Sequence, residues 1–104
     1  MASPFDHRAI DEVIHGRIRL GAVAYLATVD SALFGELRDA VGATDGNLSA
    51  HLRKLEEAGY VRIEKRFVRR RPQTRVSLNR TGREAWAGWL ERMEALRGAA
   101  APPG

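Results

Sequence analysis

The chain contains no cysteine, so a disulfide framework, a thiolate metal site and a cysteine nucleophile are all excluded. It also contains no apolar run that approaches the ~20 residues of a membrane span. Its first residues, MASPFDHR, lack the basic and then apolar order of a secretory signal. We therefore expect a cytoplasmic protein in a reducing environment, with no membrane as a partner.

Groups that could perform catalysis are also scarce. The three histidines, His7, His15 and His51, are scattered, and no glycine-rich phosphate loop accompanies them. Ser49 lies two positions before His51 on an expected helix, and side chains at that spacing diverge. The sequence therefore predicts neither an enzyme nor a cofactor.

One candidate metal site lies near the start of the chain. His7, Asp11 and His15 are spaced at i, i+4 and i+8, so on a straight helix they share one face. Two imidazoles and a carboxylate could hold Zn²⁺. Gly16 follows directly, however, and surface histidines are common. We therefore favour a solvated or interface face and predict no metal.

Positive charge is abundant, and it is concentrated in residues 62–75. This segment has seven cationic side chains and one carboxylate, Glu64, so its formal charge is +6, whereas the whole chain of 104 residues carries +4. Charge gathered in one place predicts an anionic polymer as the partner. The seven cations are Arg62, Lys65, Arg66, Arg69, Arg70, Arg71 and Arg75.

Hydrophobic residues, 44% of the chain, recur at helical spacing before residue 60. Gly42 fits the end of one helix and Thr44 the capped start of the next. Because only Gly42 and Ala43 join these two helices, we expect a helix-turn-helix corner. The predicted helices are a short one that starts at Ser3-Pro4 and carries Ile10, Val13 and Ile14, and three more over about 16–28, 34–41 and 44–59.

A hairpin and a last helix are expected in the second half. The strands run from Tyr60 to about Lys65 and over 74–78, and the tip over 68–73 holds three arginines that would be too costly to bury. Thr81 and Glu84 fit a capping box that starts a helix ending at Gly98. The predicted fold is mainly α with a β-hairpin, as one domain over 1–98 with a disordered tail over 99–104.

The helix over 44–59 has an outward polar face, because Leu48, Leu52 and Leu55 face inward. Asparagine can pair with adenine, and lysine can donate to guanine or to phosphate. Residues of the first turn approach a major groove first. An ordinary solvated face also explains such a stripe, but the basic hairpin favours DNA. The outward residues are Thr44, Asn47, His51 and Lys54, with Ser49 and Arg53 at the flanks.

Three segments resemble winged helix-turn-helix transcriptional regulators: TDGNLSAHLRKLEEAGYV (44–61), RRPQTRVSLN (70–79) and TGREAW (81–86). The most similar group is that of small winged-helix DNA-binding proteins related to the MarR and ArsR types. VIHGRIRL (13–20) resembles the first core helix of that group, so the likeness spans about 13–96. Arg17 stands where the group often has proline, which is a departure at the bend between the first two helices.

The resemblance implies a sequence-specific regulator that binds double-stranded DNA as a homodimer, with repression as the default output. It implies a recognition helix at 44–58 in the major groove and a wing at 65–75 on phosphates or the minor groove. It gives no identity for a small-molecule effector. The DNA contacts are then Thr44, Asn47, Ser49, His51, Arg53, Lys54, Lys65, Arg66, Arg69, Arg70, Arg71, Thr74 and Arg75.

The resemblance also implies that the terminal helices form the dimer interface. An effector pocket lined by Trp86, Trp89 and Met93 is the alternative, but aromatic stripes on terminal helices are more often packing. The expected interface residues are Ile10, Val13, Ile14, Trp86, Trp89, Leu90, Met93 and Leu96.

Two other functions remain open for such a fold. One is a protein-interaction module whose charged wing docks on an acidic protein, and duplex binding that weakens steeply with salt would argue against it. The other is an RNA-binding winged helix. The scarcity of aromatics at exposed positions, Phe67 aside, argues against single-strand stacking.

Overall fold

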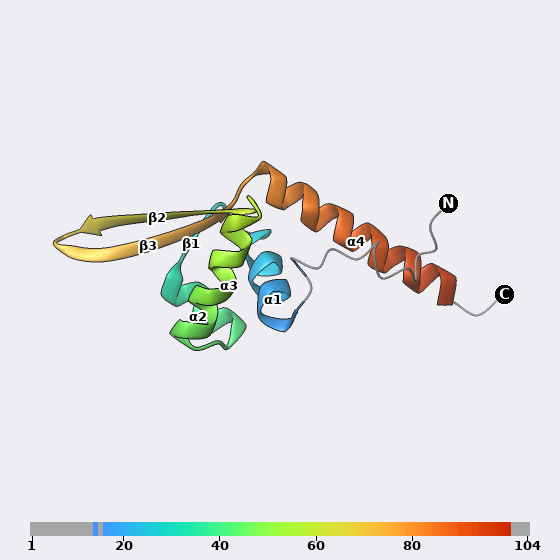
Figure 1. The fold of residues 1–104 in the computed structure, drawn as a ribbon, viewed down its shortest axis with the longest axis horizontal. Helices are drawn as coiled ribbons and strands as arrows, with labels where there is room; N and C mark the ends of the chain where they lie inside the picture. The colour runs from blue at the N-terminus through green and yellow to red at the C-terminus, as the bar shows by residue number, and fades with distance from the viewer. Residues whose placement is uncertain (1–13, 15, 101–104) are drawn as a thin grey trace.

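The computed structural model describes Ile14 and residues 16–100 (Figure 1). In chain order the elements are α1 (Arg17–Leu26), β1 (Ala32–Leu33), α2 (Phe34–Val41), α3 (Asp45–Glu57), β2 (Val61–Val68), β3 (Arg71–Leu78) and α4 (Arg80–Ala100). The architecture is mainly α with a β-hairpin, as predicted. The helix expected from Ser3 to His15 lies outside the described residues. None of the described helices is long and apolar enough to cross a membrane.

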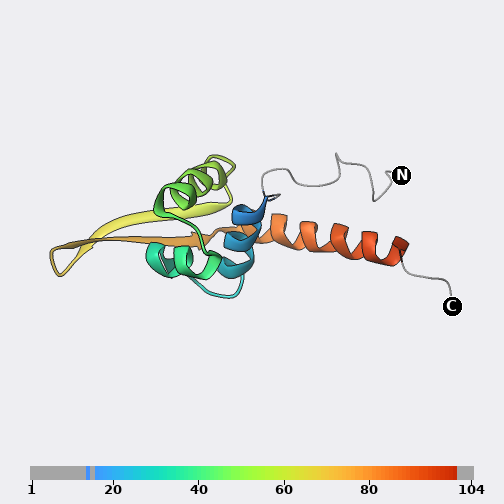
Figure 2. The same ribbon diagram turned by 90° about the horizontal axis from the view of Figure 1, so that it is seen from below.

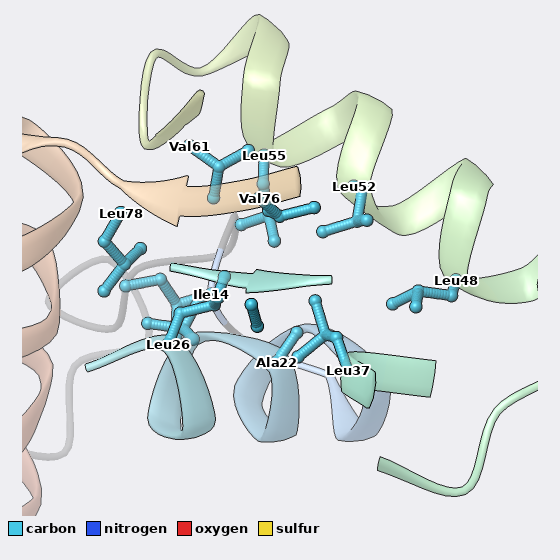
Figure 3. Packing of buried hydrophobic residues seen from close by; sticks show 12 residues of the cluster. Ile14, Ala22, Leu26, Leu37, Leu48, Leu52, Leu55, Val61, Val76 and Leu78 are labelled. Atoms are coloured by element: carbon cyan, nitrogen blue, oxygen red, sulfur yellow. The ribbon is translucent and has the colours of Figure 1, made fainter. Parts of the chain in front are cut away.

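The core lies where α1, α2 and α3 meet the sheet (Figure 3). Leu48, Leu52 and Leu55 of α3, predicted to face inward, are at most 2% exposed. Burying each leucine stabilises the fold by about 1.5–3 kcal/mol. Among the described residues, no polar or charged side chain is buried in this core. The α3 stripe is thereby fixed inward, and the opposite face of the helix is left to solvent.

The corner between α2 and α3 forms as the sequence predicts. Gly42 takes the left-handed conformation at the end of α2, with φ of 68°. Thr44 caps α3, because its hydroxyl accepts a hydrogen bond from the Asn47 N–H at 3.2 Å. Arg38 of α2 donates to the Asp45 carboxylate at 2.8 Å, which ties the first turn of α3 to α2.

The start of α4 differs from the prediction. The helix begins at Arg80, and its cap is Asn79, whose side-chain oxygen accepts from the Gly82 N–H at 2.8 Å. The expected capping box of Thr81 and Glu84 is therefore wrong. Asn79 prevails because its side-chain amide also donates to the Gly59 carbonyl at 2.6 Å, which ties the helix start to the turn between α3 and β2. At its other end α4 continues to Ala100, two residues past the predicted end at Gly98.

The hairpin is longer than predicted, and its tip is shorter. Strands β2 and β3 pair through Val68 and Arg71, so the turn is only Arg69-Arg70, both with positive φ. Two-residue turns of this kind match the twist of the strands. The expected tip over 68–73 is thus wrong, because Pro72 lies within β3 opposite Phe67. Val68 and Arg71 form the closing hydrogen-bonded pair, so the next pair, Phe67 and Pro72, is a non-hydrogen-bonded one. A backbone N–H at position 72 would point away from β2, and the proline therefore removes no hydrogen bond between the two strands.

A two-residue strand, β1, escaped prediction, since two residues show no periodicity. It adds to β3 and gives the antiparallel order β1-β3-β2. The pairs are Ala32 with Val76 and Leu33 with Arg75. Because β1 reaches no further along β3, the outer half of the hairpin has no third strand.

The molecule is elongated, with extents of 61 × 23 × 23 Å. Figures 1 and 2 show the β2–β3 hairpin extending from one end and α4 from the other, with α1, α2 and α3 grouped between them. The hairpin and α4 are therefore both available to partners outside the chain.

Candidate nucleic-acid interface

The outer face of α3 is exposed along its length. Asn47, Ser49, Arg53 and Lys54 are all exposed, as is the capping residue Thr44. Gly46 and Ala50 between them are small, so the helix surface is flat enough to enter a groove. Five of the six residues of this helix and its cap that were predicted to contact DNA are thus accessible to a duplex.

The helix is also held firmly at its N-terminal end. Arg38 donates to Asp45 and Asp39, and these hydrogen bonds raise the pKa of Arg38 above its ordinary value. Between α1 and α2, the Tyr25 hydroxyl donates to the Glu36 carboxylate, which raises the pKa of Tyr25. Both contacts brace the helices behind α3 and leave its outer face unobstructed.

His51 is the exception on α3, since it is half-buried and bonded within the chain. Its Nδ1 accepts a hydrogen bond from the Arg19 Nε of α1 at 3.0 Å. The base contact predicted for His51 therefore loses one of its two polar atoms to the scaffold. Arg19 itself was missed, because a long-range contact of this kind leaves no periodic signal in the sequence.

A groove of about 550 Å³ separates α3 from the hairpin. Ser49 and Arg53 line it from α3, and Lys65 and Thr74 line it from β2 and β3. Four residues predicted to contact DNA are thus brought together from elements that are distant in sequence. Its apolar lining consists of Phe34, Leu52 and Ile63, and Glu56 is the carboxylate on its wall.

The register of the hairpin divides its side chains between two faces. Lys65 and Thr74 share a face with the inward-facing pair Ile63 and Val76, so they continue the core side of the sheet outward. On the same strands, the other face carries a second group of polar side chains that includes three predicted DNA contacts. This second face holds Arg66, Arg71, Gln73 and Arg75.

Arg75 is not a projecting cation. It is half-buried, and its Nη1 donates to the Ser31 hydroxyl at 2.8 Å, which fastens β3 to the segment before β1. Arg62 is also engaged, in an ion pair with Glu64 at 3.1 Å. Arg75 is thus partly engaged within the chain, and the DNA contact predicted for it stays a prediction.

The other five cations of the hairpin are exposed, and within the described part of the chain they form no ion pair. Such a concentration of like charge on the outer half of the hairpin destabilises the free protein, and a polyanion relieves that repulsion. These residues are Lys65, Arg66, Arg69, Arg70 and Arg71.

The residues predicted for a dimer interface fall into two groups. Trp86 and Trp89 stack with ring centroids 5.4 Å apart, and they pack against the core of their own chain. Leu90 is 45% exposed, and Met93 and Leu96 are half-buried further along α4. Ile14 is a fully buried core residue, so its side chain offers no surface to a second chain. Ile10 and Val13 lie outside the described residues.

The candidate metal ligands His7, Asp11 and His15 also lie outside the described residues. Over Ile14 and residues 16–100, no group of three or more potential ligands could hold a metal ion.

Residues 18–97 match the family described as winged helix DNA-binding domain, and the chain belongs to that family. The helices, the corner between α2 and α3 and the hairpin are the parts of this fold, with the hairpin as its wing. The predicted fold class is confirmed, and the family is one of DNA-binding regulators and not of enzymes.

Among known proteins, the chain is similar to the uncharacterized protein MJ0432 of Methanocaldococcus jannaschii, with 30% identity over 79 residues, 76% of this chain and 86% of that protein. It is also similar to the transcriptional regulator homologue protein from Pyrococcus horikoshii OT3, with a TM-score of 0.79, 28% identity and coverage of 88% and 91% of the two chains. The MepR–DNA complex of S. aureus shares the fold, with a TM-score of 0.72, 14% identity and coverage of 88% and 75%.

Proposed function

We propose that the chain is a homodimeric transcriptional repressor that binds a pseudo-palindromic duplex operator. The observation that carries the proposal is the groove between α3 and the hairpin, with Ser49 and Arg53 on one wall and Lys65 and Thr74 on the other. Hydroxyls and cations are the side chains that hold phosphates. With α3 in a major groove, the intervening sugar-phosphate strand would lie in this groove, and the hairpin would reach the adjacent minor groove.

Sequence preference would come from the exposed face of α3, and most of the affinity from the five exposed cations of the hairpin. Affinity for duplex DNA should therefore fall steeply as salt rises, which fluorescence anisotropy with genomic fragments would measure. An affinity that is independent of salt, or binding to acidic proteins with none to duplex DNA, would refute the proposal.

Replacing Asn47 by alanine tests base reading. The Asn47 side chain is exposed in the first turn of α3, so its loss should leave the fold intact. Affinity for the selected operator should fall by about 1–3 kcal/mol, the value of a paired contact to a base. Affinity for a scrambled duplex should hardly change.

Lys54→Ala is the matched control on the same helix. Loss of a phosphate contact should weaken binding to the operator and to the scrambled duplex equally. It should also reduce the slope of log affinity against log salt concentration by about 0.9. Equal weakening of operator and scrambled duplex by Asn47→Ala would show that this residue does not read sequence.

The dimer is proposed from the shape and surface of α4. This helix packs on the core through Ala85, Trp86 and Trp89, whereas Leu90, Met93 and Leu96 take no part in the described core. An apolar stripe on a helix that projects beyond the body needs cover, and a two-fold pair of α4 helices supplies it. Two recognition helices in such a dimer should address half-sites about 34 Å apart.

Leu90→Glu is expected to convert the dimer to a monomer, because it places a charge within this stripe, at its most exposed described position. The single chain should keep its helical circular dichroism, since Leu90 is 45% exposed. Ala95→Glu, on an exposed position about 140° around the same helix, is the control and should remain dimeric. Sedimentation equilibrium decides, and an intact dimer of Leu90→Glu would refute the α4 interface.

A further inference from the structure

We propose that Phe67 is a minor-groove wedge: its ring inserts at a base step of the duplex while the neighbouring arginines hold the phosphates. This inference rests on the proposed function and adds to it a contact that is neither ionic nor made by α3. Phe67 is 77% exposed, more than the other exposed large hydrophobics of the described chain, Val68 and Leu90. An aromatic ring held in water forgoes about 1.5–3 kcal/mol of burial, so the fold alone gives no reason for it.

The register of the hairpin determines the direction of the ring. Phe67 lies two residues beyond Lys65 on the same strand face, so it extends the wall of the groove towards the tip by about 6.6 Å. This is the face that meets the sugar-phosphate strand in the proposed complex. Val68, its exposed neighbour, lies on the opposite face.

Pro72 lies opposite Phe67 on the facing strand. The two residues form a cross-strand pair next to the closing pair of the turn, where side chains approach most closely. Proline lacks rotamer freedom, so packing of the aromatic side chain against it would carry little entropic cost. A wedge needs a stiff base of this kind, because a mobile side chain would lose freedom on insertion.

The surrounding charge selects the occupant. Arg66, Arg69, Arg70 and Arg71 are all exposed within four residues of Phe67. The minor groove of a duplex matches an aromatic ring surrounded by arginines. Two rows of phosphates border apolar sugars and base steps, and an aromatic ring can insert between stacked bases and unstack them. Pyrimidine–purine steps unstack most easily, so the ring should favour such a step. An acidic protein surface offers the charge but not the apolar slot between two anionic rails.

Phe67→Ala tests the wedge in the full chain, with Val68→Ala as the matched control on the other face. Fluorescence anisotropy with the selected operator, repeated over a range of salt, should show a ten- to hundredfold loss of affinity for Phe67→Ala, about the value of one stacked base. The salt slope should stay unchanged, because no phosphate contact is lost. Val68→Ala should bind within about twofold of the unchanged chain.

A 2-aminopurine placed at successive steps of the minor-groove site reports insertion directly. Its fluorescence should rise at one step with the unchanged chain and with Val68→Ala, and should not rise with Phe67→Ala. A loss of affinity without this signal would put the ring on the deoxyribose and overturn insertion. Equal binding by Phe67→Ala would overturn the inference alone, whereas absence of duplex binding by the unchanged chain would overturn the proposed function as well.

Discussion

Gly82→Ala is expected to lower the stability of the fold more than the same change at any other described glycine. A Cβ at this position would lie 2.1 Å from the Tyr60 carbonyl oxygen and 2.9 Å from a Leu78 methyl. The oxygen belongs to the backbone and already accepts from the Asn79 N–H at 3.1 Å, so it cannot move aside cheaply. Helix α4 would have to leave the base of the hairpin, at a cost of about 3 kcal/mol or more.

Thermal unfolding followed by circular dichroism measures this loss, which corresponds to a fall in Tm of about 12 °C or more for a domain of this size. Gly88→Ala in the same helix is the control, because an added Cβ there meets nothing within 4 Å. It should stabilise the protein by about 0.8–1.0 kcal/mol through helix propensity. A Gly82→Ala protein with the same Tm as the unchanged chain would show that α4 does not pack as described.

Replacing the turn Arg69-Arg70 by Asn-Gly should change stability and DNA affinity in opposite directions. Both arginines have positive φ, 53° and 67°, a conformation that asparagine and glycine adopt with far less strain. The exchange should therefore stabilise the hairpin by about 1–2 kcal/mol, and it also removes like charges from the tip. Operator affinity should fall about a hundredfold, and the salt slope by about 1.8, as two phosphate contacts are lost.

A change in net charge alone must be separated from this effect. Arg80→Gln with Arg92→Gln removes the same charge from exposed positions on α4, which lie away from the hairpin tip. That variant should keep most of its affinity, since exposed charges beyond about 10 Å are largely screened. An Asn-Gly turn that binds the operator undiminished would mean that the strained arginines serve some purpose other than DNA.

The sequence predicted those parts of the fold that rest on local periodicity or on a single capping residue. Leu48, Leu52 and Leu55 repeat at helical spacing, and Thr44 and Gly42 carry the side chain and the missing Cβ that a helix start and end require. Where two local signals competed, the outcome depended on tertiary contacts. Asn79 prevailed over Thr81 because the Gly59 carbonyl fixes its side chain, which no window of sequence reveals.

The candidate site shows the same division. Exposure of Asn47, Ser49 and Lys54 follows from the stripe behind them, so sequence was sufficient. His51 and Arg75 are half-buried, and each is hydrogen-bonded to a residue far away along the chain. Their partners, Arg19 and Ser31, lie 32 and 44 residues away. Long-range contacts of this kind have no period, and only the packed structure displays them.

Because the molecule is long, a small rotation at one end would move the other end by a large distance. Strand β3 passes into α4 through Asn79 alone, and Gly82 of α4 lies directly against the Tyr60 carbonyl, so the start of the helix is packed on the base of the hairpin. The whole molecule is 61 Å long. In the dimer proposed above, a rigid-body tilt of ~10° at the α4 helices would move each hairpin tip by about 10 Å, or roughly three base-pair steps of duplex. Small adjustments where the two helices cross would thus be magnified into different operator spacings.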